Sequence, residues 1–443
     1  MFGTSGIRGG LNKVSPSLCL KVGRAVGGMA PRVVVARDGR VSGEALVNAV
    51  KAGVESAGSD LTYIGLAPTH TLAWFSREQN AMGIMVTASH NPPSNNGIKI
   101  FDRNGVEIKR KTEREIEESL ENTEAAPWDD WTESKTRDVI DSYLSEALGY
   151  IGPETDLDLK VAVDCANGVG ALTTPPLLRE LGCEVVSLNG NIDGKFPGRA
   201  PKPEKSSLGD LIQLVRNRDF DVGFAHDGDA DRLVVVGEDG SIIPEDGVLA
   251  VLASDAVKRS SVSEPVVVTT PNTSSKIDEK VEKEGGDVER VPLGGLPEAL
   301  EGRNDVVFAA EPWKHMFPDF GGWIDGSVSA GIVARLLNEE GGGDALFDDV
   351  KDISIRKMNV ECPERLKEKV MDALSKEIPK HFDAEVDTSY GIRVSFEDGS
   401  WGLVRPSGTE SLIRVYAESE DGNLLDEIGE VVKSEIKQFQ VRS

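Results

Sequence analysis

Three aspartates at alternating positions, Asp227, Asp229 and Asp231, follow a short apolar segment that ends at Ala225. Carboxylates held this close repel one another unless protons or a divalent cation neutralise them, and hard oxygen ligands suit Mg²⁺ or Ca²⁺. An EF-hand calcium loop is excluded, because Arg232 stands where that loop requires glycine and a strand-like run follows. The remaining alternative to a metal site is a solvated acidic turn. The regular spacing favours the metal, and we predict these aspartates as its ligands.

Ser89 stands in a loop of sequence TASHNP that follows another apolar run. A hydrolase nucleophile is not indicated, because the G-x-S-x-G context is absent. A serine that carries a phosphoryl group beside the metal needs no such context, since the metal and nearby cations would stabilise the transferred group. The base that takes the proton of an acceptor hydroxyl would then be Lys99, His90 or Arg8. His90 could equally orient the loop through hydrogen bonds to the backbone.

A third polar segment, RPSGTE, contains Arg405, Ser407, Gly408 and Thr409. A guanidinium, two hydroxyls and the backbone N–H groups around a glycine are suited to binding phosphate. An ordinary hairpin turn explains the same residues equally well when the segment is taken alone. The glycine-rich start, Phe2–Gly9, is basic but lacks the GK[ST] of a P-loop and does not follow a strand.

The elements that must position these loops recur three times along the chain. Each repeat has a β-branched strand, an amphipathic helical stretch, a second strand, and a third apolar strand that ends in a polar loop. The first strands begin at Arg32, Leu159 and Pro265, the second at Leu61, Cys183 and Asp287, and the third at Met82, Phe220 and Asp305. Alternation of strands and helices predicts a largely parallel or mixed sheet in each unit.

Ligands gather at the loops beyond strand ends in sheets of this kind. If the three units face one cleft, the loops that carry Ser89, the aspartates and Glu311 would meet there. From about Lys351 the pattern changes to one helix and several antiparallel strands. We therefore predict three related α/β domains and a smaller C-terminal α+β domain around a central cleft. The predicted boundaries are 1–135 with the Ser89 loop, 136–248 with the metal loop, 249–350 with the sugar loop, and 351–443 with the phosphate-binding turn.

The composition is that of a globular protein, with 443 residues, 39% hydrophobic residues and a net charge of −26. Such acidity argues against a nucleic-acid partner, and an anionic substrate would need a local cluster of cations. No apolar run reaches the length of a membrane span, and the N-terminus does not have the pattern of a signal peptide. We expect a cytoplasmic monomer or dimer that binds a small-molecule sugar phosphate.

The order and spacing of TASHNP with NGIK, DGDADR and RPSGTE resemble the α-D-phosphohexomutase superfamily, which includes phosphoglucomutases, phosphomannomutases and phosphoglucosamine mutases. The opening FGTSGIRG is similar to the start of the shorter microbial members. The resemblance implies a four-domain, Mg²⁺-dependent isomerase that interconverts hexose 1-phosphates and 6-phosphates. A phosphoserine enzyme and a sugar bisphosphate would be its intermediates, and the bisphosphate would also be an activator.

The resemblance also implies a role for each polar segment. Ser89 would be the phosphoserine and a fourth Mg²⁺ ligand with the three aspartates, and Arg232 would contact its phosphate. Arg8 and Lys99 would lie near the transferring proton. The substrate phosphate that does not react would be held by Arg405, Ser407, Gly408 and Thr409.

The sugar loop departs from the family pattern. Members carry a G-E-x-S-G-H-like loop, whereas this chain has Ala310-Glu311-Pro-Trp313-Lys-His315. Glu311 keeps the carboxylate that would read sugar hydroxyls. Trp313 stands where a serine would be, and we expect it to bind substrate by shaping the pocket beside Glu311. The predicted substrate is a hexose phosphate of the glucosamine, glucose or mannose type. A phosphopentomutase and a non-catalytic sugar-phosphate-binding protein remain as alternatives.

Overall fold

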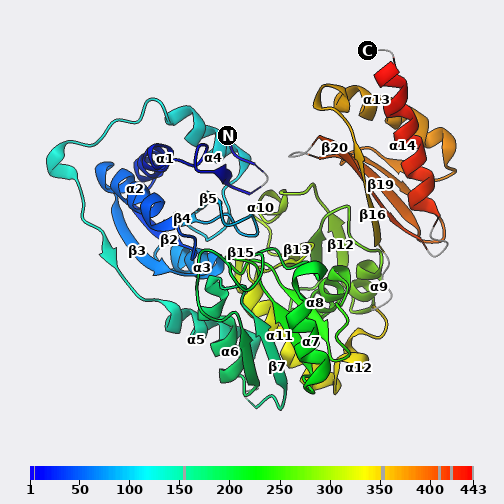
Figure 1. Cartoon of the computed structure of the whole chain (residues 1–443), viewed down its shortest axis with the longest axis horizontal. Helices are drawn as coiled ribbons and strands as arrows, with labels where there is room; N and C mark the ends of the chain where they lie inside the picture. The colour runs from blue at the N-terminus through cyan, green and yellow to red at the C-terminus, as the bar shows by residue number, and fades with distance from the viewer. Residues whose placement is uncertain (4, 153–155, 351–354, 408–410, 420–422, 442–443) are drawn as a thin grey trace.

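The computed structural model describes residues 1–3, 5–152, 156–350, 355–407, 411–419 and 423–441 of the chain. Its strands form four separate sheets, and each is built from one continuous stretch of the sequence (Figure 1). Three are mixed α/β sheets and the fourth is antiparallel. No helix in these residues is both long and apolar enough to cross a membrane.

The first domain holds a six-stranded sheet in the order β1-β5-β4-β2-β3-β6. Its elements are β1 (Ile7–Gly10), α1 (Pro16–Met29), β2 (Arg32–Arg37), α2 (Gly43–Ser56), β3 (Asp60–Leu66), α3 (Thr69–Glu78), β4 (Met82–Val86), β5 (Asn95–Phe101), α4 (Arg110–Ser119) and β6 (Lys135–Thr136). A short 3₁₀ helix at Trp128–Asp130 precedes β6, and α5 (Ile140–Ile151) leads to the second domain.

The second sheet runs β10-β9-β7-β8 and the third β12-β11-β13-β14-β15. The second domain contains β7 (Lys160–Asp164), α6 (Thr174–Glu180), β8 (Glu184–Leu188), α7 (Gly209–Asn217), β9 (Val222–Ala225) and β10 (Val234–Gly237), with 3₁₀ helices at Val169–Leu172 and Lys205–Ser207. The third contains α8 (Glu245–Arg259), β11 (Val266–Thr269), α9 (Lys276–Lys283), β12 (Asp287–Arg290), α10 (Leu296–Ala299), β13 (Val306–Glu311), β14 (Lys314–Phe317), β15 (Gly321–Ile324), α11 (Gly326–Glu340) and α12 (Gly343–Phe347).

The same strand pattern recurs in the three mixed sheets, as predicted. A central strand, β2, β7 or β11, pairs in parallel with its two sheet neighbours. The third strand of each repeat, β4, β9 or β13, then pairs antiparallel with the strand that follows it. The loops after β4, β9 and β13 therefore occupy equivalent places in three sheets.

Buried strands and close helix packing explain why the first domain folds this way. Residues 33–36 of β2 are valines and alanine buried on both faces, as a parallel strand covered by helices requires. On one face α1 packs directly against α2, and a Cβ at Gly23 would lie 2.2 Å from the carbonyl oxygen of Val50. A side chain at this glycine would force the two helices apart.

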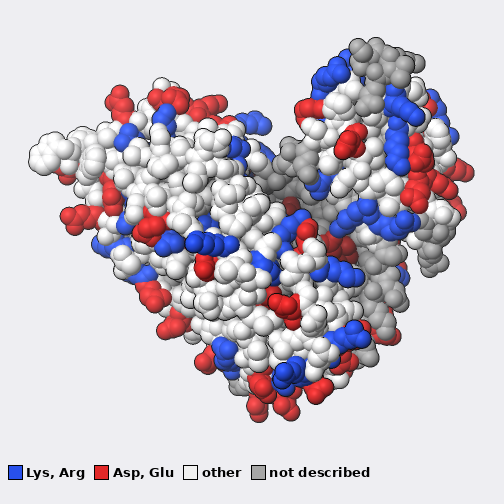
Figure 2. Space-filling view, in the orientation of Figure 1, with Lys and Arg blue, Asp and Glu red and all other residues white. Residues whose placement is uncertain are grey.

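The C-terminal domain is an antiparallel sheet in the order β16-β20-β19-β18-β17. Its elements are β16 (Ile355–Glu361), α13 (Glu364–His381), β17 (Glu385–Asp387), β18 (Ile392–Ser395), β19 (Trp401–Pro406), β20 (Leu412–Glu418) and α14 (Leu424–Val441). Its helices and sheet enclose a hydrophobic core of their own, whereas one continuous core extends through the first three domains. Figure 2 shows a deep notch between the first and C-terminal domains, in agreement with the predicted central cleft.

The C-terminal domain is tied to the third domain by polar contacts, most of them partly buried. Glu418 at the end of β20 accepts hydrogen bonds from the Ser274 hydroxyl at 2.5 Å and from the Ser275 N–H at 3.0 Å. Arg393 donates to the carbonyl oxygen of Pro271, and Lys357 pairs with Glu245. These contacts hold the C-terminal domain, which forms one wall of the notch, against the third domain.

Asp246, at the start of α8 beside this junction, is buried and accepts one hydrogen bond, from the Ser274 N–H at 3.0 Å. Burial and then the negative charge of Glu245 raise the pKa of Asp246 to about 7. In the folded protein the neutral carboxyl of Asp246 is favoured up to about pH 7. Ionisation of this buried group destabilises the fold above pH 7, and the destabilisation decreases as the pH falls toward the ordinary aspartate pKa.

We expect Asp246→Asn to raise the melting temperature at pH 8, where it removes a buried charge, and to have little effect near pH 4. Melting curves from pH 4 to 8 would measure this difference. The matched control is Asp210→Asn, which changes an exposed acid in the first turn of α7. A gain that does not depend on pH, or an equal gain in the control, would contradict the assignment.

Candidate active site

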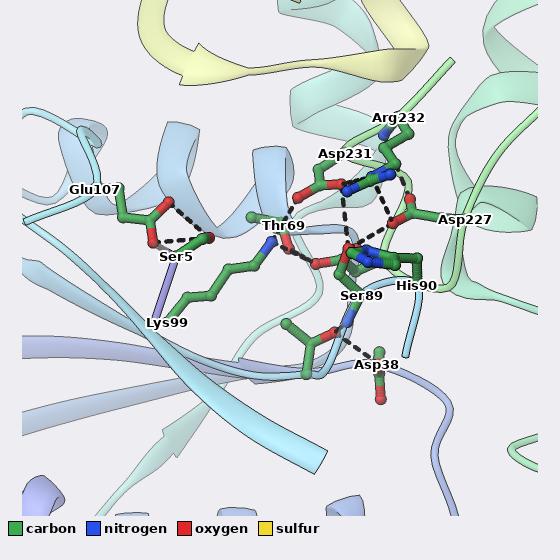
Figure 3. Close-up of polar contacts among 12 residues, drawn as sticks. Ser5, Asp38, Thr69, Ser89, His90, Lys99, Glu107, Asp227, Asp231 and Arg232 are labelled. Atoms are coloured by element: carbon green, nitrogen blue, oxygen red, sulfur yellow. Dashed lines mark hydrogen bonds and ion pairs between the residues drawn. The ribbon is translucent and has the colours of Figure 1, made fainter. Parts of the chain in front are cut away.

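The three loops in equivalent sheet positions meet at one place, as predicted, and Figure 3 shows the two that carry Ser89 and Asp227. The β4–β5 loop carries Ser89, and its hydroxyl donates to Asp227 Oδ2 of the β9–β10 loop at 2.6 Å. The β9–β10 loop also contacts the β13–β14 turn, because the Leu233 N–H donates to the Trp313 carbonyl oxygen at 3.0 Å. The repeat therefore brings together residues more than 200 positions apart.

Ser89 is fully buried and has a positive φ of 51°, a backbone conformation that L-residues rarely adopt. A buried arginine, Arg40, holds the loop in this conformation. Its guanidinium donates to four backbone carbonyl oxygens of the loop, those of Ser89 at 2.8 Å, Asn91 at 2.8 Å, Pro92 at 2.7 Å and Asn95 at 2.9 Å. Strain of this kind persists only where the surroundings enforce it, which is typical of functional sites.

Asp38 links this arginine to the serine backbone. Its Oδ2 accepts from Arg40 Nε at 3.0 Å and from the Thr87 hydroxyl at 2.7 Å, and the Thr87 oxygen accepts the Ser89 N–H at 2.9 Å. Our sequence analysis did not identify Asp38 or Arg40. The signal was present, because the Asp-Gly-Arg triplet directly follows the first strand of the first repeat.

Asp227, Asp229 and Asp231 are all buried, and one oxygen of each lies within 4.8 Å of the others. Burial and then the charges of Asp231 and Asp229 raise the pKa of Asp227 well above its usual range. Asp229 Oδ1 is buried and has no hydrogen-bond partner among the described residues. An unpaired oxygen among three crowded carboxylates fits a hard divalent cation, which would neutralise the repulsion.

Lys99 on β5 reaches this cluster from the first domain. Its ammonium lies 2.8 Å from Asp229 Oδ2 and 2.6 Å from Asp231 Oδ2. Burial acts to lower the pKa of Lys99, but the two carboxylates outweigh it and the pKa is raised, so Lys99 stays charged. Thr69 at the start of α3 completes the contacts, donating its hydroxyl to Asp229 Oδ2 at 2.6 Å.

His90 lies beside Ser89, whereas Arg8 contacts a different serine, Ser5. The Nδ1 atom of His90 is 3.3 Å from Ser89 Oγ. Burial, followed by the charges of Arg232 and Arg8, lowers the pKa of His90 to about 2, so its ring is neutral at physiological pH. Arg8 on β1 donates to the Ser5 hydroxyl at 3.0 Å, and that hydroxyl in turn donates to Glu107 at 2.9 Å.

Arg232 of the aspartate loop and Trp313 of the β13–β14 turn form a pair. Arg232 Nε lies 3.9 Å from Asp227 Oδ2, and the guanidinium carbon lies 5.8 Å from the centre of the Trp313 ring. Trp313 has a φ of 68° and packs against a hydrophobic cluster of the second domain. It does not line the pocket that contains Glu311. Its ring contacts Arg232 instead, a position that the sequence could not reveal.

The pocket beside Glu311 lies between the first and third domains. Glu311 Oε1 accepts a hydrogen bond from the Gly294 N–H at 2.7 Å. The other carboxylate oxygen, Oε2, lies 3.8 Å from Lys314 Nζ. The polar side chains of the wall include Ser5, Thr69, Lys99, Glu107, Asp231 and Lys314, and its apolar side chains include Ile108, Leu296, Met316 and Trp323. The pocket therefore adjoins the metal loop.

The turn predicted to bind phosphate is described only in part. Arg405 on β19 donates to the Tyr416 hydroxyl at 3.1 Å, and Ser407 is buried. The Ser407 carbonyl oxygen accepts from Lys367 Nζ at 2.7 Å. Gly408 and Thr409 lie outside the described residues.

Known proteins match this chain along its length. Residues 1–127 and 141–240 match phosphoglucomutase/phosphomannomutase alpha/beta/alpha domains I and II, and residues 358–434 match the C-terminal domain. The phosphopentomutase of Thermococcus kodakarensis is 41% identical, over 99% of this chain and 98% of the relative. The probable phosphoglucosamine mutase of Methanopyrus kandleri is 40% identical, over 98% and 97%.

A crystal structure of a phosphoglucomutase/phosphomannomutase family protein from Burkholderia thailandensis has the same fold. It is 27% identical with a TM-score of 0.85 and covers 99% of this chain and 98% of its own. These matches confirm the resemblance given by the motifs. The chain therefore belongs to the α-D-phosphohexomutase superfamily and is a mutase, which makes it an isomerase.

Proposed function

We propose that this protein is a Mg²⁺-dependent phosphosugar mutase that works through phospho-Ser89. The observation that carries the proposal is the short contact of Ser89 Oγ with Asp227, 2.6 Å, inside a buried cluster of three carboxylates. Asp227, Asp229 and Asp231, with the Ser89 phosphate, would hold the ion. Bound Mg²⁺ would neutralise charge on the transferring phosphoryl group.

In the first half-reaction the bond between phosphorus and Ser89 Oγ breaks, and a bond forms to a hydroxyl of the sugar monophosphate. The hydroxyl proton passes to a base, for which Arg8, His90 and Lys99 remain the predicted set. Arg232 contacts the phosphoryl oxygens. Two carboxylates keep the Lys99 side chain protonated. In this state Lys99 supplies positive charge, and it accepts the hydroxyl proton only after losing its own.

The product of this step is a sugar bisphosphate, which turns over and returns its other phosphoryl group to Ser89. The phosphate that is not reacting is bound by the C-terminal turn, through Arg405, Ser407, Gly408 and Thr409. Glu311 binds sugar hydroxyls, so that both orientations of the bisphosphate use the same contacts.

We propose a hexose phosphate as the substrate, interconverted between its 1-phosphate and 6-phosphate. A relative named as a probable phosphoglucosamine mutase, 40% identical over nearly the whole chain, supports the glucosamine type. A phosphopentomutase is the second candidate, because the relative of that name is 41% identical and the sugar loop departs from the hexose pattern at Trp313. Intact Ser89, Lys99 and aspartates argue against a silent binding protein.

A panel of glucosamine, glucose, mannose, ribose and deoxyribose 1-phosphates, each with catalytic bisphosphate and Mg²⁺, tests the proposal. Conversion of a hexose phosphate with the highest kcat/KM supports it. A pentose phosphate that outranks every hexose would select the second candidate. If no sugar in the panel is converted, the proposed substrate class is wrong.

We expect Arg405→Ala to raise KM for every sugar of the panel without changing their order. The lost charge-assisted contact is worth about 1.5–3 kcal/mol, roughly tenfold to a hundredfold in affinity. Arg365→Ala, which removes an exposed arginine on α13 of the same domain, is the matched control and should change little.

The Glu311→Gln variant is expected to behave differently from Arg405→Ala on the same panel of sugars. A site built around particular hydroxyls discriminates strongly when one of them is missing, so this variant should change the order of the sugars. The assignment of Arg405 to the shared phosphate and of Glu311 to the sugar hydroxyls would be wrong if Arg405→Ala changed the order of the sugars while Glu311→Gln slowed every sugar equally.

A further inference from the structure

Lys314 is a buried lysine that the sequence motifs do not assign to any role. It is the first residue of β14, and only 8% of its surface is exposed. In the described part of the chain its ammonium makes no hydrogen bond, and the nearest ion-pair partner, Glu311 Oε2, is 3.8 Å away. Lys99, in contrast, is bound closely by two carboxylates. Burying an ammonium is costly unless a hydrogen-bonding anion accompanies it.

The position of Lys314 is fixed by a tight hairpin. Glu311 and Lys314 face each other across the β13–β14 pair, and only Pro312 and Trp313 connect them. The turn is anchored to the metal loop through the Leu233 N–H bond to Trp313 and the packing of Trp313 against Arg232. Lys314 therefore has a set place relative to the aspartates, which limits the entropy lost when it binds a ligand.

Its charge acts at the Ser89 end of the pocket. Lys314 lines that pocket together with Lys99, Asp231 and Glu311. Asp231 in turn lies beside the serine, because its Oδ1 accepts from the Ser89 hydroxyl at 3.4 Å. The Lys314 ammonium is thus 3.8 Å from the carboxylate that would read the sugar and shares a pocket with Asp231 of the loop that would hold the metal.

We propose that Lys314 binds a phosphate oxygen of the sugar phosphate at the Ser89 end of the pocket, supplying a cation to the group that is transferred. The proposal rests on the proposed function and adds a substrate-binding residue to it. A phosphate dianion provides the hydrogen-bonding partner that the Lys314 ammonium lacks. The lysine in turn supplies local positive charge in a protein whose net charge of −26 otherwise repels a phosphate. No covalent step at the lysine is involved.

Binding to the Ser89→Ala protein tests the proposal without turnover. Calorimetry with Mg²⁺ and glucose 1,6-bisphosphate would compare this parent with Lys314→Met, Lys314→Arg and Lys109→Met added to it. Lys109 is the matched control, because it is a half-buried lysine of the first domain that pairs with Glu301 of the third and lies outside the pocket. We expect Lys314→Met to bind at least about tenfold more weakly, and Lys314→Arg and Lys109→Met to bind within a few-fold of the parent.

Single-turnover transfer from phosphorylated enzyme with Ser89 intact gives the second readout. Lys314→Met should slow transfer to the sugar phosphate by about tenfold or more while its melting temperature stays near that of the wild type. If Lys314→Met matches Lys109→Met in both measurements, the Lys314 proposal is overturned and the proposed function stands. If the Ser89→Ala parent binds no bisphosphate and the wild type transfers no phosphoryl group, both proposals are overturned.

Discussion

Replacing Ser89 with alanine is expected to lower mutase turnover by more than roughly three orders of magnitude, because it removes the hydroxyl proposed to accept and return the phosphoryl group. The fold should survive. The hydroxyl contributes one hydrogen bond to Asp227, and alanine tolerates the positive φ of this position no worse than serine does. Steady-state rates, with circular dichroism of the same samples, would measure both effects.

The matched control for this variant is Ser94→Ala, which removes an exposed hydroxyl from the same loop. It should retain nearly wild-type turnover. A well-folded Ser89→Ala protein with near-native activity would overturn the covalent mechanism, and an equal loss in Ser94→Ala would show that the loop tolerates no substitution.

Removal of the metal is expected to have the next largest effect. Excess chelator should stop turnover and added Mg²⁺ should restore it, because the aspartate cluster is suited to a hard cation. Asp229→Asn should weaken Mg²⁺ binding and lower turnover together, by roughly a hundredfold or more. It replaces a buried carboxylate whose Oδ1 has no hydrogen-bond partner among the described residues and whose Oδ2 already accepts from Lys99 and Thr69.

Calorimetric Mg²⁺ titration reports the metal independently of activity. Asp219→Asn, an exposed acid of the same domain whose positive φ asparagine tolerates, serves as the control and should bind Mg²⁺ like the wild type. Full activity in excess chelator, or an unchanged Mg²⁺ affinity in Asp229→Asn, would contradict the metal assignment.

The sequence was sufficient to predict the repeated strands and the meeting of their loops. Apolar β-branched runs such as those beginning at Arg32 and Leu159 leave little choice but buried parallel strands, and such strands fix where their following loops lie. One strand was not predicted. β6 is only two residues long and pairs in parallel with β3, a contact decided by tertiary packing and not by composition.

Side-chain direction could not be predicted at the sugar loop. Whether Trp313 or Lys314 faces the pocket depends on the positive φ of Trp313 and on the partner surface of the second domain, and neither can be read from a single chain segment. Arg40 was missed for a related reason. The Asp-Gly-Arg triplet marks the position of Arg40, but the carbonyl partners lie about 50 positions further along the chain, and backbone acceptors leave no signature in residue types.

The central claim is that Ser89 carries the transferred phosphoryl group, and detection of that group tests it most directly. Enzyme incubated with glucose 1,6-bisphosphate and Mg²⁺ would be analysed by intact mass and peptide mapping, before and after addition of a hexose monophosphate. We predict the mass of one added phosphoryl group, located on Ser89, lost when the monophosphate is added and absent from Ser89→Ala. An active enzyme that never carries phosphate on Ser89, or that carries it on another residue, would contradict the account.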